Sequence, residues 1–163
     1  MDVAVEERRG EEFREALTMG LYVSLSLQTV ALATPTPDVG EDRAGVALTL
    51  FLTAVGLLLA HQVAFRLSTK LTNRGVVDVG SVALLRAQTL GGLPVAFIAS
   101  VPVLLLGEIG LTVAELTLLA FVGVVGFLAA RSGGASRTHA LVYVIGLVVV
   151  IAAILALKIA VNH

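Results

Sequence analysis

The chain has 163 residues, of which 57% are hydrophobic and 14% are charged, and its net charge at pH 7 is −1. Soluble domains carry about a quarter charged residues, so this chain, with a mean hydropathy of +0.97, lacks the polar residues to cover its apolar blocks in water and is predicted to be an all-α, polytopic integral membrane protein. The near-neutral charge gives no reason to expect nucleic acid as a partner, and the absence of cysteine excludes disulfides, thiolate catalysis and cysteine metal sites.

The N-terminal end combines a charged segment with the first apolar run. Residues 1–12 hold acids and bases at helical spacing, so we expect a short, solvated cytoplasmic helix that leads into a first span at residues 13–34. Gly10 weakens it as one continuous helix. The run ends in Ala31-Leu32-Ala33, the pattern of a signal-peptidase site. The acids before the run and the polar residues inside it favour a retained helix instead.

Two further spans follow a loop in which Pro35 and Pro37 stop the first helix. The second span is predicted at residues 44–67 and ends in a basic turn. The third covers residues 76–106, which is longer than a bilayer of about 30 Å requires, so residues 87–106 are expected to form its membrane part. Pro94 and Pro102 predict a kink there.

The last two spans are joined by a basic, glycine-rich loop. A tight turn at residues 107–110 leads into the fourth span at 111–130, and the fifth is predicted at 139–161. Because no repeat or long linker interrupts the chain, we expect residues 1–163 to form a single transmembrane domain, a bundle of five helices.

The distribution of basic residues predicts how the bundle lies in the membrane. With five alternating spans, nine of the eleven Lys and Arg residues fall on the side of the N-terminus and two on the other side. The positive-inside rule therefore predicts a cytoplasmic N-terminus and an outer C-terminus. Arginine outnumbers lysine nine to two, which favours a GC-rich prokaryotic source. We expect a multi-pass protein of the prokaryotic plasma membrane.

Polar residues gather at one predicted depth near the cytoplasmic side, on every helix except the fourth. These residues are Glu15, Tyr22, His61, Gln62, Arg66, Asp78, Arg86, Gln88, His139 and Tyr143. Polar groups inside a span are costly and are usually paired, drawn to the interface, or functional. We therefore predict a polar cluster of His61, Gln62, Arg66, Arg86 and Gln88. His61 is either a proton-linked switch or a neutral histidine in a helix seam, and the two arginines are either lipid anchors or an anion clamp.

On the outer side, one acid and one base lie at similar depth in consecutive spans. Glu115 is about one turn inside the fourth span, and Lys158 is about one turn inside the end of the fifth. Because consecutive helices run antiparallel, we predict a Glu115–Lys158 ion pair. The alternative for Glu115 is a proton- or cation-coupled carboxylate.

Small residues repeat every fourth position on several spans. Such stripes let helix backbones approach closely in lipid, where apolar burial gives no drive to associate. They predict helix seams inside one subunit or between subunits, and we expect self-association in the bilayer. The stripes are Gly56, Ala60 and Ala64; Gly92, Ala96 and Ser100; Ala152, Ala156 and Ala160. Gln88 extends the second stripe and is predicted to be buried.

Motifs for hydrolase, P-loop, dinucleotide or zinc chemistry are absent from the sequence, so we expect no enzyme, no cofactor and no metal. The favoured function is a small homo-oligomeric channel or transporter subunit that uses the polar cluster. The alternative is a non-enzymatic scaffold, sensor or accessory subunit of a larger complex. A membrane enzyme acting on lipid head groups is a third reading, which the absence of paired acids for magnesium disfavours.

Overall fold

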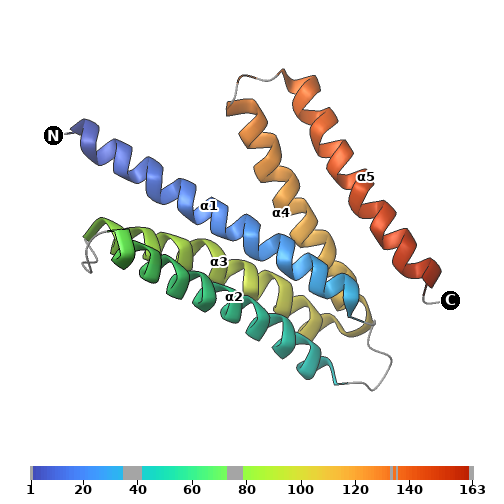
Figure 1. Ribbon diagram of the computed structural model, residues 1–163. Helices are drawn as coiled ribbons and strands as arrows, with labels where there is room; N and C mark the ends of the chain where they lie inside the picture. Colours follow the sequence, from blue (N-terminus) through green and yellow to red (C-terminus); the bar gives the residue numbers. More distant parts are fainter. Residues whose placement is uncertain (1, 35–41, 73–78, 133, 135, 162–163) are drawn as a thin grey trace.

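The computed structural model describes residues 2–34, 42–72, 79–132, 134 and 136–161. This part of the chain is all-helical, as predicted, and its elements follow one another through short connections (Figure 1). They are α1 (Asp2–Ala33), α2 (Arg43–Thr72), α3 (Val79–Leu106), the short 3₁₀ turn η1 (Gly107–Ile109), α4 (Gly110–Ser132) and α5 (Arg137–Val161).

Four of the helices are long and apolar enough to cross a membrane. The candidate spans are Val5–Ala33, Arg43–Leu71, Gly80–Leu106 and Gly110–Ser132. The shortest has 23 residues, or about 35 Å of helix, enough for a bilayer core of about 30 Å. In α5 the apolar stretch within the described residues is Arg137–Val150, shorter than a span. The lengths and composition of these four helices therefore indicate a multi-pass membrane protein, and the fifth span and the orientation stay predictions.

The N-terminal segment differs from expectation in its continuity. Residues 2–12 belong to the same helix as the first predicted span, and α1 passes through Gly10 without a break. The glycine is exposed and nothing surrounds it within 4 Å. A single solvated glycine costs a helix about 1 kcal/mol, which the neighbouring helix-forming residues and the packing of α1 on α3 offset. α2 likewise extends past the predicted residue 67 to Thr72.

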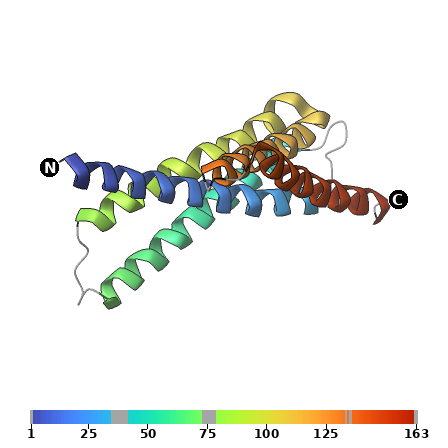
Figure 2. The same cartoon turned by 90° about the horizontal axis from the view of Figure 1, so that it is seen from above.

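Three helices lie together and two lean away from them. α1, α2 and α3 pack on one another, with α3 in contact with both, and α4 crosses α1 and α3 (Figures 1 and 2). α5 packs mainly on α4, and this hairpin diverges from the first three helices toward the α4–α5 turn. The N-terminal end of α1 and the C-terminal end of α5 lie at opposite ends of the molecule. The core lies where α1 to α4 meet and includes Leu27, Leu50 and Leu118.

The α1–α3 crossing depends on glycine. A Cβ built on Gly91 would lie 1.9 Å from the carbonyl oxygen of Ala16, so the two backbones touch. A Cβ on Gly92 would lie 2.4 Å from Leu58 of α2. Ala96 and Ser100, the next members of that stripe, are also buried. The predicted stripe on α3 is therefore a seam inside the chain.

The other predicted stripes have different surroundings. On α2, Gly56, Ala60 and Ala64 are exposed, and nothing lies within 4 Å of the Cβ position of Gly56. The side chains of Ala152, Ala156 and Ala160 lie outside the described part of the structure. The α2 stripe is thus an open face of this chain.

The predicted tight turn between α3 and α4 is present and is glycine-dependent. Gly107 has a φ of 63°, in the left-handed region that glycine adopts most readily. A Cβ there would lie 2.8 Å from the guanidinium carbon of Arg43, which covers the turn from the start of α2. Both prolines lie inside α3, which remains a continuous helix from Val79 to Leu106.

Candidate functional site

A hydrogen bond between a buried amide and a half-buried carboxylate joins α1 to α3. Gln88 is 1% exposed, and its side-chain Nε2 donates a hydrogen bond of 3.0 Å to Oε2 of Glu15. The amide oxygen Oε1 of Gln88 has no hydrogen-bond partner among the described residues. Gln88 is buried because it shares the glycine seam face, one turn before Gly92. The contact therefore places a carboxylate and a free amide oxygen at the α1–α3 interface.

A second polar contact joins α2 to α3. Gln62 donates from Nε2 to the hydroxyl oxygen of Thr89, at 2.7 Å. The Thr89 hydroxyl in turn donates to the carbonyl oxygen of Leu85, at 2.9 Å. Both side chains are half-buried. Because Gln62 and Thr89 are both neutral, this contact satisfies the two groups without placing a charge between the helices.

His61 lies against an aromatic ring of α1. The ring centroids of His61 and Tyr22 are 6.4 Å apart, and their planes are inclined by 43°. The imidazole is half-buried. The predicted cluster is therefore divided: Gln88 and His61 face α1, whereas Gln62 faces α3.

The two arginines of the predicted cluster share a groove between α2 and α3, which we call the basic groove. Its volume is about 460 Å³, and its lining is Gln62, Arg66, Lys70, Val82, Leu85, Arg86 and Thr89. All three cations in it are exposed. Lys70 and Thr89 were not among the predicted site residues, although the four-residue spacing of Gln62, Arg66 and Lys70 on α2 indicates a common face.

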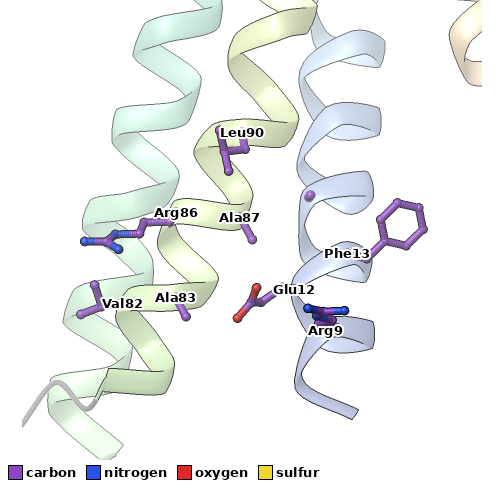
Figure 3. A pocket seen from close by; sticks show the side chains of 9 residues that line it. Arg9, Glu12, Phe13, Val82, Ala83, Arg86, Ala87 and Leu90 are labelled. Atoms are coloured by element: carbon purple, nitrogen blue, oxygen red, sulfur yellow. The ribbon is translucent and has the colours of Figure 1, made fainter. Parts of the chain in front are cut away.

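A larger cavity of about 710 Å³ lies between α1 and α3, and we call it the α1–α3 cavity. Its lining is Arg9, Glu12, Phe13, Ala16, Val82, Ala83, Arg86, Ala87 and Leu90. Glu12 points from α1 toward α3, whereas Arg86 turns toward α2 (Figure 3). Arg86 and Val82 border both the cavity and the basic groove. Ala16 and Ala87 are sequence neighbours of Glu15 and Gln88, so that hydrogen bond lies beside the cavity.

The last histidine predicted at this depth does not join the cluster. His139 is exposed at the start of α5, where its Nδ1 lies 2.9 Å from the Ser136 hydroxyl. The backbone N–H of His139 also donates to the Ser136 side chain, at 3.3 Å. This is a helix N-cap, and it explains the residue structurally. Asp78 lies outside the described residues, as does the side chain of Tyr143.

Polar groups also occur in the α1–α4 interface, toward the other end of α1. The Ser24 hydroxyl donates to the carbonyl oxygen of Leu118, at 3.3 Å. Glu115, one turn before Leu118, is 6% exposed. Gln28, one turn after Ser24, is also 6% exposed, and neither of its amide atoms has a hydrogen-bond partner among the described residues. The side chain of Lys158 lies outside the described part, so the Glu115–Lys158 ion pair stays a prediction.

Among the described residues, no group of three or more histidines and carboxylates could hold a metal ion. What this geometry offers is binding chemistry: cations in the basic groove, and a carboxylate with amide groups at the α1–α3 interface. Comparisons with protein-family models, with curated proteins and with solved structures found no match to this chain.

Proposed function

We propose that the chain is a subunit of a homo-oligomeric membrane channel or transporter, which passes an ion or a small polar solute along α1 and α3. The observation that carries this proposal is the α1–α3 cavity of about 710 Å³, lined by charged residues of membrane-capable helices. Arg9 and Glu12 belong to the segment that is predicted to lie in water, so they would keep the mouth of this cavity hydrated. A hydrated entrance on the side of the N-terminus, predicted to be cytoplasmic, is what a transport path requires.

A hydrogen bond beside the cavity supplies the closing element of this path. The Gln88–Glu15 hydrogen bond bridges α1 and α3 next to the lining residues Ala16 and Ala87. Hydrogen bonds between membrane helices contribute about 0.6 kcal/mol on average, so a passing solute can replace this one at little cost. The free Oε1 of Gln88 and the Glu15 carboxylate then act as acceptors for an ion or a solute N–H or O–H group.

The oligomeric part of the proposal is supported by the open face of α2. A path enclosed by α1 and α3 alone leaves one side facing lipid, so neighbouring subunits are needed to complete it. The exposed stripe of Gly56, Ala60 and Ala64 has the spacing that lets a second helix approach closely.

Solute flux in proteoliposomes tests this function. Gln88→Leu removes the buried amide beside the cavity and is expected to change the flux of the transported species at least about tenfold, as loss of a group bound during passage would. Gln28→Leu is the matched control, because it makes the same substitution at another buried position of a membrane-capable helix, outside the cavity lining. The proposal is wrong if wild-type protein passes no common ion or small solute above empty liposomes, or if both variants behave alike.

A second candidate is the non-enzymatic scaffold, sensor or accessory subunit. It is favoured by the way in which Gln62 and Gln88 bond within the chain, to Thr89 and Glu15, as structural ties between helices do. The exposed, charged first turns of α1 would then be the contact for a partner. Recovery of a stoichiometric partner protein from native membranes, together with no flux from the purified chain, would favour this candidate.

A further inference from the structure

The basic groove holds three positive charges that are arranged by helix geometry. On α2, Gln62, Arg66 and Lys70 follow at four-residue spacing and share one face. The Gln62–Thr89 contact fixes the antiparallel register with α3, and Arg86, three residues before Thr89, therefore lies at the level of Arg66. Two arginines and a lysine from two helices thus line one groove of about 460 Å³.

These charges are not neutralised by the described part of the chain. The described lining of the groove contains no carboxylate, and no ion pair to Arg66, Lys70 or Arg86 is present among the described residues. Neighbouring like charges repel one another at the low dielectric of a membrane interface. An anion held between them removes this repulsion and gives each cation a partner.

Apolar side chains border the end of the basic groove that is predicted to face the centre of the bilayer. Leu59, one turn deeper than Gln62 on α2, is exposed. Farther along the same two helices lies an apolar groove of about 440 Å³, lined by residues that include Leu48, Phe51 and Leu104. Leu48 precedes Arg66 by 18 residues, and Leu104 follows Arg86 by the same number, which is about five full turns, so both grooves open on the same side of the α2–α3 pair.

We propose that the basic groove binds the phosphate of an anionic phospholipid from the leaflet on the side of the N-terminus. Arg66 and Arg86 offer planar guanidinium groups that suit phosphate oxygens, and Lys70 adds a flexible charge near the water. The acyl chains lie along the apolar strip that runs from Leu59 to the apolar groove of Leu48 and Leu104. A soluble phosphate would use the charges but leave this strip uncovered, so the amphiphilic face selects a lipid. The groove shares Arg86 with the α1–α3 cavity, but lipid binding to it does not require that a solute passes through that cavity.

Lipid binding to the purified, full-length protein tests this site. The protein is placed in neutral mixed micelles, and bound phosphatidylglycerol and phosphatidylcholine with the same acyl chains are counted by native mass spectrometry. Wild-type protein is expected to retain phosphatidylglycerol preferentially. Arg66→Gln, Lys70→Gln and Arg86→Gln are each expected to weaken that retention about fivefold, the effect of one cation near an anionic lipid surface.

Two triple variants separate a built site from general charge attraction, and the first combines Arg66→Gln, Lys70→Gln and Arg86→Gln. Arg8→Gln, Arg14→Gln and Arg137→Gln together remove three exposed cations that are predicted to lie on the same side of the membrane. This variant is expected to keep the preference, whereas the triple variant of the groove loses it, with both showing wild-type helix content by circular dichroism. Equal loss in both triple variants overturns the proposal. Displacement of the lipid by millimolar inorganic phosphate also overturns it, because the groove would then be a site for soluble anions.

Discussion

At the scale of single residues, the buried amides differ in how they are satisfied. Gln62 and Gln88 each donate a hydrogen bond to another helix, whereas both amide atoms of Gln28 are buried without a partner among the described residues. A buried polar group that lacks a partner costs about 1–3 kcal/mol. Gln28→Leu is therefore expected to raise the free energy of unfolding in detergent by about that amount, measured by denaturant titration. Destabilisation would contradict this prediction, because it would mean that the Gln28 amide makes a hydrogen bond in the folded protein.

The sequence predicts the depth of these residues better than it predicts their partners. Helix counting places Glu15, Tyr22, His61 and Gln88 at one level, and the glycine stripe predicts that Gln88 is buried, as it is. It does not predict that Gln88 meets Glu15 or that His61 meets Tyr22. Those contacts depend on the rotation of α1 about its axis. The glycines and other small residues of α1 do not determine this rotation, which is set only when the helices pack.

At the scale of elements, the α1–α3 crossing is the contact most sensitive to volume. Gly91→Ala places a methyl group 1.9 Å from the carbonyl oxygen of Ala16, so the helices must separate at a cost of about 1–3 kcal/mol. Gly10→Ala, on the exposed first turns of α1, meets no neighbour within the described chain and is expected to be neutral or stabilising by up to about 1 kcal/mol. Thermal unfolding of both variants in the same detergent gives the comparison. Equal midpoints would contradict the close crossing.

The ends of the helices show why sequence boundaries were too short in places. α2 continues to Thr72 and α4 to Ser132, past the predicted ends at residues 67 and 130, because charged and polar residues with good helix propensity extend an apolar helix beyond the bilayer. Apolar runs mark where a helix meets lipid, and they do not mark where it ends. The glycine turn after α3 was predicted correctly. Gly107 adopts a left-handed conformation there, and a right-handed helix cannot continue through it.

At the scale of the whole molecule, four membrane-capable helices form the fold, and the α1–α3 cavity is the proposed entrance for a solute. The all-helical, multi-pass class follows from composition, and four spans agree with it. The α1–α3 cavity and the basic groove could not be predicted, since both depend on which helices are neighbours. Sequence order suggests that α1 packs chiefly on α2, whereas its main contact is with α3. The polar residues thus divide between the α1–α3 cavity, which is the proposed entrance, and the basic groove between α2 and α3.

If solute passes through the α1–α3 cavity, chemical blocking of this cavity must reduce the flux. The natural chain has no cysteine, so Ala83→Cys, in the cavity lining, can be modified alone with a charged, membrane-impermeant thiosulfonate in proteoliposomes. Ser136→Cys, exposed before α5, is the control. We expect modification to reduce flux at least about tenfold for Ala83→Cys, with recovery after reductant, and to leave the control unchanged. Undiminished flux after complete modification of Ala83→Cys would contradict the account.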